Sequence, residues 1–350
     1  MARGSISIAL AFSFVWSAFA QCLDYDEHPP QLRDVAVRCS VVKDTTPFFI
    51  YRYLMINGAT STGCISSFDI DIRRPPNSAE LPTFGLEDYP RYVRREALGM
   101  PNAIDVIPVA IPILPKFKGQ TSAWSADFGI DGSVGWMRAL PKYLLEPGMK
   151  LDGLVLTTYG LPRLRTFVVG PKYHPVPDTT RNETTEEEEK AFARVLDSIK
   201  VKGTTIGPTA PPSPFVPSSF LDTLLSYTRQ SAKLGWIGKD RDDDCDDDER
   251  PDDGIVRNIE QRLQKAKREL AKGDTVQTRM ELGKLVQKIE RLWKRSQKEE
   301  KNDKRERWEK QEKVIITSEA YALLKFNAEY LIDSLPRKKG GKDRDDKDHR

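Results

Sequence analysis

Residues 64–72 read CISSFDIDI, and their pattern decides the fold class of the first half of the chain. Phe68, Ile70 and Ile72 alternate with aspartates. Successive side chains of a β-strand point to opposite faces of a sheet, so this period of two is typical of a strand with one buried face. The stretch therefore predicts sheet structure.

The surrounding sequence repeats this character. Seven further short segments are rich in branched or aromatic residues, namely 34–42, 48–56, 104–113, 124–128, 134–137, 153–158 and 165–169. Turn signals such as Asp131-Gly132 and Pro147-Gly148 separate several of them. Many short strands with this spacing favour an immunoglobulin-like antiparallel β-sandwich, which we expect over residues 22–175. Prolines within 104–113 indicate an edge strand.

The apolar pattern changes in the second half of the chain. Residues 176–217 are polar, first Glu-rich and then Pro-rich, and predict a linker with a short helix near 186–200. From 218 to 336 apolar residues recur at helical spacing, which predicts a three- to four-helix bundle. We expect Ser218 or Ser219, Asp274, and Thr317 or Ser318 to cap helices. The charged residues 337–350 predict a disordered tail.

Three stretches of the helical half carry a resemblance to known modules. They are AKRELAKGD (266–274), LGKLV (282–286) and TSEAYALLKFNAEYLIDSLP (317–336). Together they resemble the FIVAR-like helical repeats, which are spacer and attachment modules of exported bacterial proteins. Charged insertions at 239–253 and 295–313 depart from that pattern. The first half, with its YRY at 51–53, is similar to the N-terminal sandwich domains of the same uncharacterised proteins. The resemblance implies export and a sandwich fold but no known reaction.

The N-terminus has the features of a secretory signal. Arg3 is followed by an apolar run from Ile6 to Trp16, and Ala18-Phe19-Ala20 supplies small residues for cleavage. We expect cleavage after Ala20 and a secreted or periplasmic protein. No later segment is apolar enough to cross a bilayer, so no transmembrane segment is expected in the mature chain.

Export makes disulfides permissible. The four cysteines, Cys22, Cys39, Cys64 and Cys245, allow three connectivities, and the sequence does not choose between them. Our prediction is a Cys39–Cys64 bridge. Cys22 and Cys245 then either remain thiols or join the two halves of the chain.

The charge is balanced overall and concentrated locally. The formal net charge is +3, from 55 Lys/Arg and 52 Asp/Glu, and 43 of these charged residues lie between 239 and 313. The acidic loop at 239–254 offers hard oxygen ligands suited to Ca²⁺. Its candidate ligands are Asp240, Asp242, Asp244, Asp246 and Asp248. Neither register matches an EF-hand, because Cys245 or Asp247 replaces the glycine at position six. A solvated, self-repelling loop is the simpler interpretation.

The segment 291–313 has ten Lys/Arg against six Asp/Glu, with Trp293 and Trp308 among them. Basic and aromatic residues together can bind nucleic acid or another anionic polymer. The mixed signs at helical spacing favour a solvated helix instead, so we expect nucleic acid not to be the partner.

The sequence contains no recognisable catalytic motif. The three histidines, His28, His174 and His349, lack the spacing of a metal or catalytic site. Asp69 and Asp71 share one strand face, and a carboxylate pair of this kind supports a secreted hydrolase as an alternative. We expect a non-enzymatic exported protein that binds an unknown protein or a cell-surface polysaccharide. A Ca²⁺-stabilised structural module is a further alternative, and no other cofactor is expected.

Overall fold

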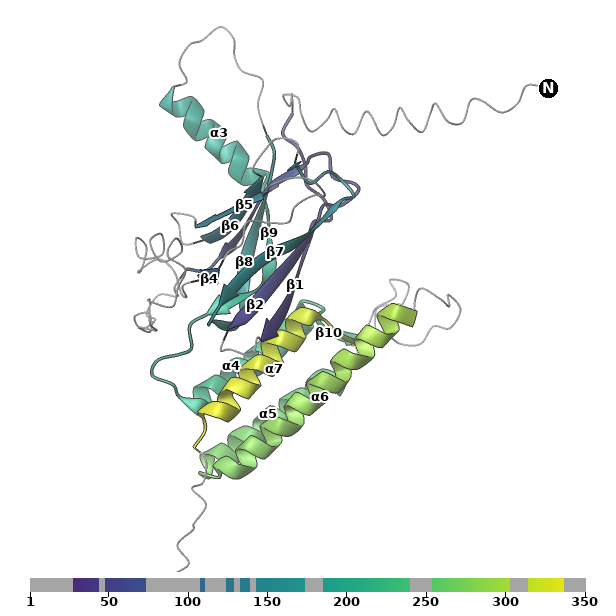
Figure 1. Ribbon diagram of the computed structural model, residues 1–350. Helices are drawn as coiled ribbons and strands as arrows, with labels where there is room; N and C mark the ends of the chain where they lie inside the picture. The colour runs from purple at the N-terminus through teal and green to yellow at the C-terminus, as the bar shows by residue number, and fades with distance from the viewer. Residues whose placement is uncertain are drawn as a thin grey trace, which may run out of the picture. The chain divides into compact units, whose positions relative to one another are not determined.

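The computed structural model describes residues 28–43, 48–73, 108–110, 124–128, 133–138, 143–173, 185–239, 254–302 and 314–336 (Figure 1). The chain divides into two units, Met1–Pro211 and Pro212–Arg350. The described residues form antiparallel sheets and five helices, so the fold is mixed α and β. The predicted signal peptide, the acidic residues 240–253 and the tail 337–350 lie outside the described residues.

The first unit contains two antiparallel sheets. One has the order β1-β2-β7-β4, and its strands are β1 (Ala36–Lys43), β2 (Phe49–Ile56), β7 (Lys150–Thr158) and β4 (Pro108–Ala110). The other has the order β5-β6-β3-β8-β9, and its strands are β5 (Trp124–Phe128), β6 (Ser133–Arg138), β3 (Ile65–Asp71), β8 (Leu161–Pro171) and β9 (Val201–Thr209). β4 lies at a sheet edge, where a proline removes no ladder hydrogen bond.

Tyr53 on β2 joins the two sheets. It is fully buried, and its ring centroid lies 5.6 Å from that of Phe68 on β3 and 5.7 Å from that of Trp136 on β6. Its hydroxyl donates a hydrogen bond to the Ile206 carbonyl on β9 at 3.1 Å. Burial, with smaller contributions from Cys39 and Tyr51, raises the pKa of Tyr53 well above its ordinary value and keeps the hydroxyl a donor.

Asn57, in the turn after β2, ties together two further segments. Its side chain is fully buried, and Nδ2 donates to the carbonyls of Gly63 at 3.0 Å and Leu145 at 2.9 Å. Its backbone N–H donates to the Met149 carbonyl at 3.0 Å. Buried carbonyls need such donors, so this one side chain holds the start of β3 against the 143–149 segment.

The predicted linker at 176–217 is wrong over part of its length. Residues 201–209 form β9, which pairs with β8 along its whole length and belongs to the five-stranded sheet. The proline and glycines of this strand suggested a linker, but β9 is an edge strand, where Pro208 is tolerated. The sheet therefore extends beyond residue 175.

The helix expected near 186–200 is α3 (Glu186–Ser198). Thr185 caps its first turn, and Glu188 donates its backbone N–H to the Thr185 hydroxyl while its carboxylate accepts from the Thr185 N–H at 2.8 Å. Phe192 contacts Tyr173, with ring centroids 5.9 Å apart.

The predicted Cys39–Cys64 bridge is also wrong. Cys64 is disulfide-bonded, whereas Cys39 is a buried thiol outside any disulfide, with its sulfur 3.8 Å from the Ser40 carbonyl. Cys39 pairs with Tyr53 across β1 and β2, in the sheet that does not contain Cys64. The disulfide partner of Cys64 lies outside the described residues.

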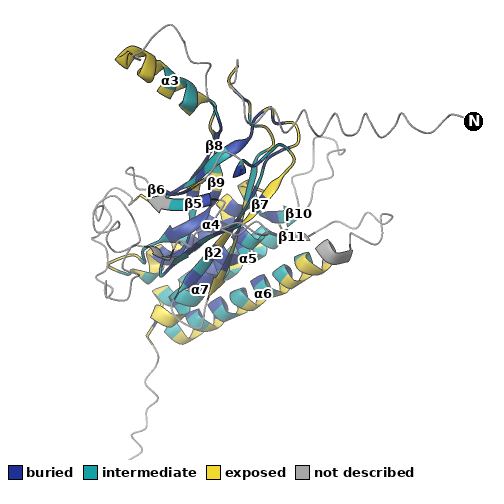
Figure 2. Ribbon diagram, turned by 45° about the horizontal axis from the view of Figure 1, so that its top comes forward, coloured by how far each residue is buried: buried dark blue, intermediate teal, exposed yellow. Residues whose placement is uncertain are grey.

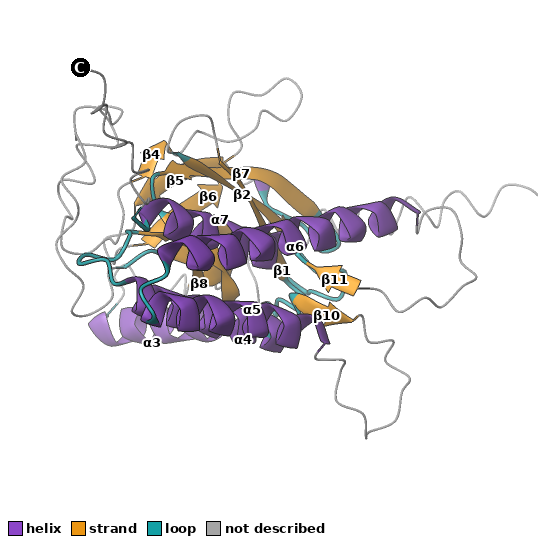
Figure 3. Cartoon of the chain, turned by 90° about the horizontal axis from the view of Figure 1, so that it is seen from below, coloured by secondary structure: helices purple, strands orange, loops and turns teal. Residues whose placement is uncertain are grey.

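The second unit is mainly helical (Figure 3). Its helices are α4 (Pro217–Lys233), α5 (Gly254–Ala271), α6 (Thr275–Asn302) and α7 (Ser318–Ser334). α4 and α6 each pack against both α5 and α7. The N-cap of α4 is Val216, with Pro217 in the first turn, and not the predicted Ser218 or Ser219. Thr317 caps α7 as predicted.

Hydrogen bonds stabilise the helix ends of the second unit. Gly273 has φ +77°, a left-handed conformation that lets α5 turn back into α6, and Asp274 accepts a hydrogen bond from the Gln277 N–H at 2.9 Å. Arg279 donates to the carbonyls of Ile332 at 2.7 Å and Leu335 at 3.1 Å. These carbonyls end α7 and have no partner within the helix.

A two-stranded sheet was not expected from the sequence. β10 (Ile237–Lys239) pairs with β11 (Val314–Ile316), so residues more than seventy positions apart lie side by side. Among the described helices, none combines the length and the apolarity that a membrane span requires.

We predict that Asn57→Ala lowers the free energy of unfolding by about 1–3 kcal/mol, because the buried Gly63 carbonyl loses its donor and the Leu145 carbonyl keeps only the Ile65 N–H. Urea unfolding measures this. Ser40→Ala, at an exposed position of β1, is the matched control and is expected to change stability by less than about 0.5 kcal/mol. Equal losses in the two variants would contradict the role given to Asn57.

We predict that the thiol of Cys39 reacts with iodoacetamide only after denaturation, because the residue is fully buried. Cys64 is expected to react only after reduction. Peptide mapping without reductant measures both and identifies the partner of Cys64. A peptide that joins Cys39 to Cys64 would contradict the structure.

Candidate functional site

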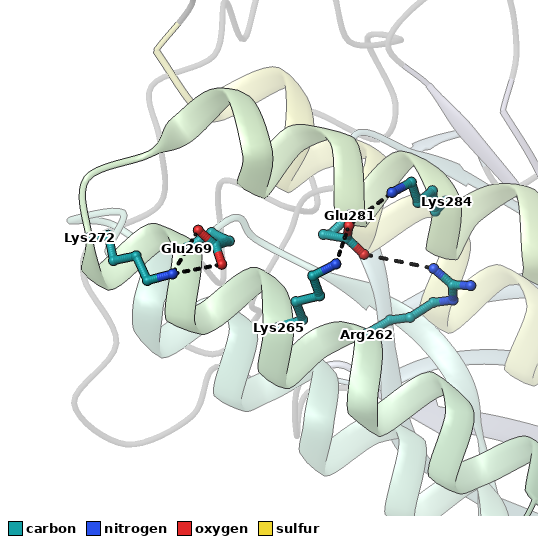
Figure 4. Close-up of polar contacts among 6 residues, drawn as sticks. All are labelled: Arg262, Lys265, Glu269, Lys272, Glu281 and Lys284. Carbon is teal, nitrogen blue, oxygen red and sulfur yellow. Dashed lines mark hydrogen bonds and ion pairs between the residues drawn. The ribbon is translucent and has the colours of Figure 1, made fainter.

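Charged side chains from α5 and α6 converge on Glu281 (Figure 4). The Glu281 Oε1 atom lies 3.0 Å from Nζ of Lys265 and 3.0 Å from Nζ of Lys284. Its Oε2 atom lies 3.7 Å from Nη1 of Arg262. One carboxylate thus faces three cations and leaves this cluster with an excess of positive charge.

Helix geometry explains how the cluster forms. Lys284 lies three residues after Glu281 on α6, and Arg262 lies three residues before Lys265 on α5, so each pair shares a helix face. The turn at Gly273 makes the helices antiparallel neighbours. Their inner faces are buried through Leu263, Ala266, Leu282 and Leu285, which aligns the charged stripes beside the seam.

The carboxylate is covered while its partners remain partly in solvent. The side chain of Glu281 is 2% exposed, whereas those of Lys265 and Lys284 are 51% and 45% exposed. The hydrogen bond from Lys284 has the largest effect on the Glu281 pKa and, with that from Lys265, holds it below its ordinary value against the opposing effect of desolvation. The group therefore stays ionised at neutral pH.

The same face of α6 continues as a cationic stripe. We define the α6 stripe as the cations spaced three or four residues apart on one face of the helix, namely Lys284, Lys288, Arg291, Arg295 and Lys298. Lys288 is half-buried and the other four are exposed. Figure 2 shows exposed residues along the length of α6. At 1.5 Å per residue the stripe is about 21 Å long.

The nearby carboxylates are paired elsewhere. Glu290 lies on another side of α6 and contacts Nζ of Lys325 on α7 at 2.8 Å. Glu269 pairs with Lys272 at 3.0 Å, and Glu260 pairs with Arg229 on α4 at 2.7 Å. Within the described part of the chain, no carboxylate forms an ion pair with the α6 stripe beyond Lys284.

The calcium ligands predicted from the sequence are not tested by the structure. Asp240, Asp242, Asp244, Asp246 and Asp248 all lie outside the described residues. In the ranges that are described, no group of three or more His, Cys, Asp or Glu side chains is arranged to hold a metal ion. Calcium binding by the acidic loop therefore stays a prediction.

Both aspartates of the predicted carboxylate pair, Asp69 and Asp71, lie on β3. Arg73 holds Asp71, with Nη2 2.6 Å from Oδ2 and Nε 3.0 Å from Oδ1. Desolvation, the largest single effect, raises the Asp71 pKa, but the contacts with Arg73 together lower it below its ordinary value. A carboxyl group with a lowered pKa is a poor proton donor at neutral pH, which does not suit the acid of a glycosidase. Asp69 is half-buried on the same strand.

The comparisons with known proteins give no relative for this chain: no family model, no curated protein and no solved structure matches it.

The sequence does not single out the Glu281 cluster, because its charges are densest in the acidic loop and in residues 291–313. One signal was available, because Glu281 and Lys284 have pairing spacing and Asp274 marks a tight turn that brings α5 back beside them. The burial of Glu281 depends on packing and has no local signature.

We predict that Glu281→Gln lowers the free energy of unfolding by about 1–3 kcal/mol, since it removes a buried charge that three cations share. Glu269→Gln is the matched control. That carboxylate lies in the same helical hairpin but pairs with one exposed lysine, so a loss below about 1 kcal/mol is expected. Urea unfolding of both variants makes the comparison, and a smaller loss for Glu281→Gln would contradict it.

The difference in stability between the wild type and Glu281→Gln should depend on pH. The pKa of Glu281 is lowered in the folded state, so its contribution is fully present above the unfolded value of about 4.3. It is lost as the pH falls through the lower folded-state pKa. A difference that grows on acidification would refute this assignment.

Proposed function

We propose that this chain is an exported, non-enzymatic binding protein with a structural role at or outside the cell surface, either secreted or periplasmic. Its first unit is an immunoglobulin-like β-sandwich, and its second is a four-helix bundle of the FIVAR-like kind. The partner is a protein or a cell-surface polysaccharide.

The sandwich assignment is supported by the contacts of Tyr53. This residue of the four-stranded sheet touches Phe68 and Trp136 of the five-stranded sheet, which is the inter-sheet packing that a sandwich requires. The bundle assignment is supported by the packing of α4 and α6 against both α5 and α7.

A binding role is supported above all by the α6 stripe. Like charges spaced about 5–6 Å apart repel each other and contribute nothing to folding by themselves. Lys288, Arg295 and Lys298 have no carboxylate partner among the described residues, although other lysines of the unit are paired. A row of unpaired cations is the kind of surface that a partner of opposite charge neutralises.

The buried polar side chains of the first unit support a scaffold role. Tyr51 donates to the Gly160 carbonyl at 2.8 Å, Trp124 to the Tyr143 carbonyl at 3.0 Å, and Arg165 to the Pro208 carbonyl at 2.6 Å. Each side chain holds a backbone segment in place. These hydrogen bonds stabilise the sheets and the turns between them.

We predict that the full chain, expressed in a bacterial host with a Sec pathway, is recovered outside the cytoplasm with Gln21 as its first residue. Cell fractionation and N-terminal sequencing measure this. A variant that lacks residues 2–20 is the control and is expected to stay in the cytoplasm. Recovery of the uncleaved chain from the cytoplasm would contradict the proposed export.

A further inference from the structure

The α6 stripe is a linear array of charge. Its five cations project from one face of a single helix, and neighbouring ones lie about 5–6 Å apart. Arg262 and Lys265 of α5 extend the positive charge across the seam at the Lys284 end. Between Lys284 and Lys298, this face holds the five cations and the uncharged Gln287, and no carboxylate. Such an array is complementary to a polymer that carries regularly spaced anions.

A linear array of cations favours an extended anionic polymer over a folded protein. Specific protein interfaces have a buried core that is depleted of charge, and charged residues belong to the rim. Every residue of the α6 stripe is charged, so the stripe has no uncharged centre of the kind that forms the core of a protein interface. Several weak charge contacts made by one polymer add through their high effective concentration, so the individual contacts need not be strong.

The aromatic residues disfavour single-stranded nucleic acid as the occupant. Proteins that bind it stack bases on exposed aromatic rings. The Trp293 ring is stacked on Tyr321 of α7, with centroids 5.2 Å apart, so it serves helix packing on another side of α6. Trp308 lies outside the described residues.

We infer that the α6 stripe binds an anionic cell-surface polysaccharide, whose carboxylate or phosphate groups pair with Lys288, Arg291, Arg295 and Lys298. This inference rests on the proposed function, because export is what brings the chain to such a polymer. It deepens that proposal by naming the surface and the partner.

Glu281 is a positioning residue for this surface. Its carboxylate holds Lys265, Lys284 and Arg262 at one end of the stripe, while the cations beyond Lys284 remain available. Glu281 is 2% exposed, so it presents little negative charge to a polymer that approaches from solvent. The cluster thus anchors the end of the stripe and keeps the face positive.

The test measures binding of the full chain to four probes by biolayer interferometry. Polygalacturonic acid supplies carboxylates, a phosphate-bearing teichoic acid supplies phosphates, dextran is the neutral polymer, and duplex DNA is the competing class of polyanion. We expect binding to one or both anionic polysaccharides, with an affinity that falls as salt rises, and none to dextran. Tighter binding of DNA than of either polysaccharide would overturn the inference.

The variant Lys288→Gln/Arg291→Gln/Arg295→Gln removes the centre of the stripe. At about 50 mM salt we expect it to bind polysaccharide about tenfold more weakly, with a shallower salt dependence, because three charge contacts are lost. The matched control is Lys190→Gln/Arg194→Gln/Lys200→Gln, which removes the same charge from exposed positions of the first unit. It should bind within about twofold of the wild type.

Two further results keep the test decisive. Lys288→Arg retains the charge and should bind as the wild type does, and circular dichroism should show unchanged helix content in the triple variant. Wild-type affinity in the triple variant would overturn the inference. An exported chain that does not bind would refute only this inference, whereas a chain that binds but stays in the cytoplasm would refute only the proposed function.

Discussion

The carboxylate of Glu281 is the interaction on which the charged face of the helical unit depends. It is almost fully covered, and desolvation of a carboxylate is costly unless cations and hydrogen bonds compensate. Lys265 and Lys284 supply that compensation from two helices. The pairing therefore holds α5 against α6 in one register. The cations further along α6 remain available to bind a partner of opposite charge.

The sheets of the first unit bury large aromatic rings, and several of its buried polar side chains donate to backbone carbonyls. Tyr53 fills the space between the sheets with its ring and places its hydroxyl on the Ile206 carbonyl. In the turn after β2, the Asn57 Nδ2 group supplies donors to two backbone carbonyls. Buried polar side chains in this unit therefore stabilise backbone segments.

The sequence predicted secondary structure correctly where buried residues recur at a regular spacing along the chain. The alternation at Phe68 and Ile70 predicted β3, and the caps at Asp274 and Thr317 predicted the starts of α6 and α7, because strand and helix periodicity are properties of neighbouring residues. It failed for β9, whose Thr, Gly and Pro residues resemble a linker. That strand exists because β8 offers it a ladder of hydrogen bonds along its whole length.

The sequence by itself determined the two kinds of secondary structure, the start of the helical half near residue 218, and the concentration of charge in the second half. Only the tertiary structure decided which cations share a carboxylate, that Cys39 stays out of a disulfide, and that β10 meets β11. The physical reason is that amphipathic periods are local, whereas an ion pair, a disulfide or a strand pair joins residues that only packing brings together.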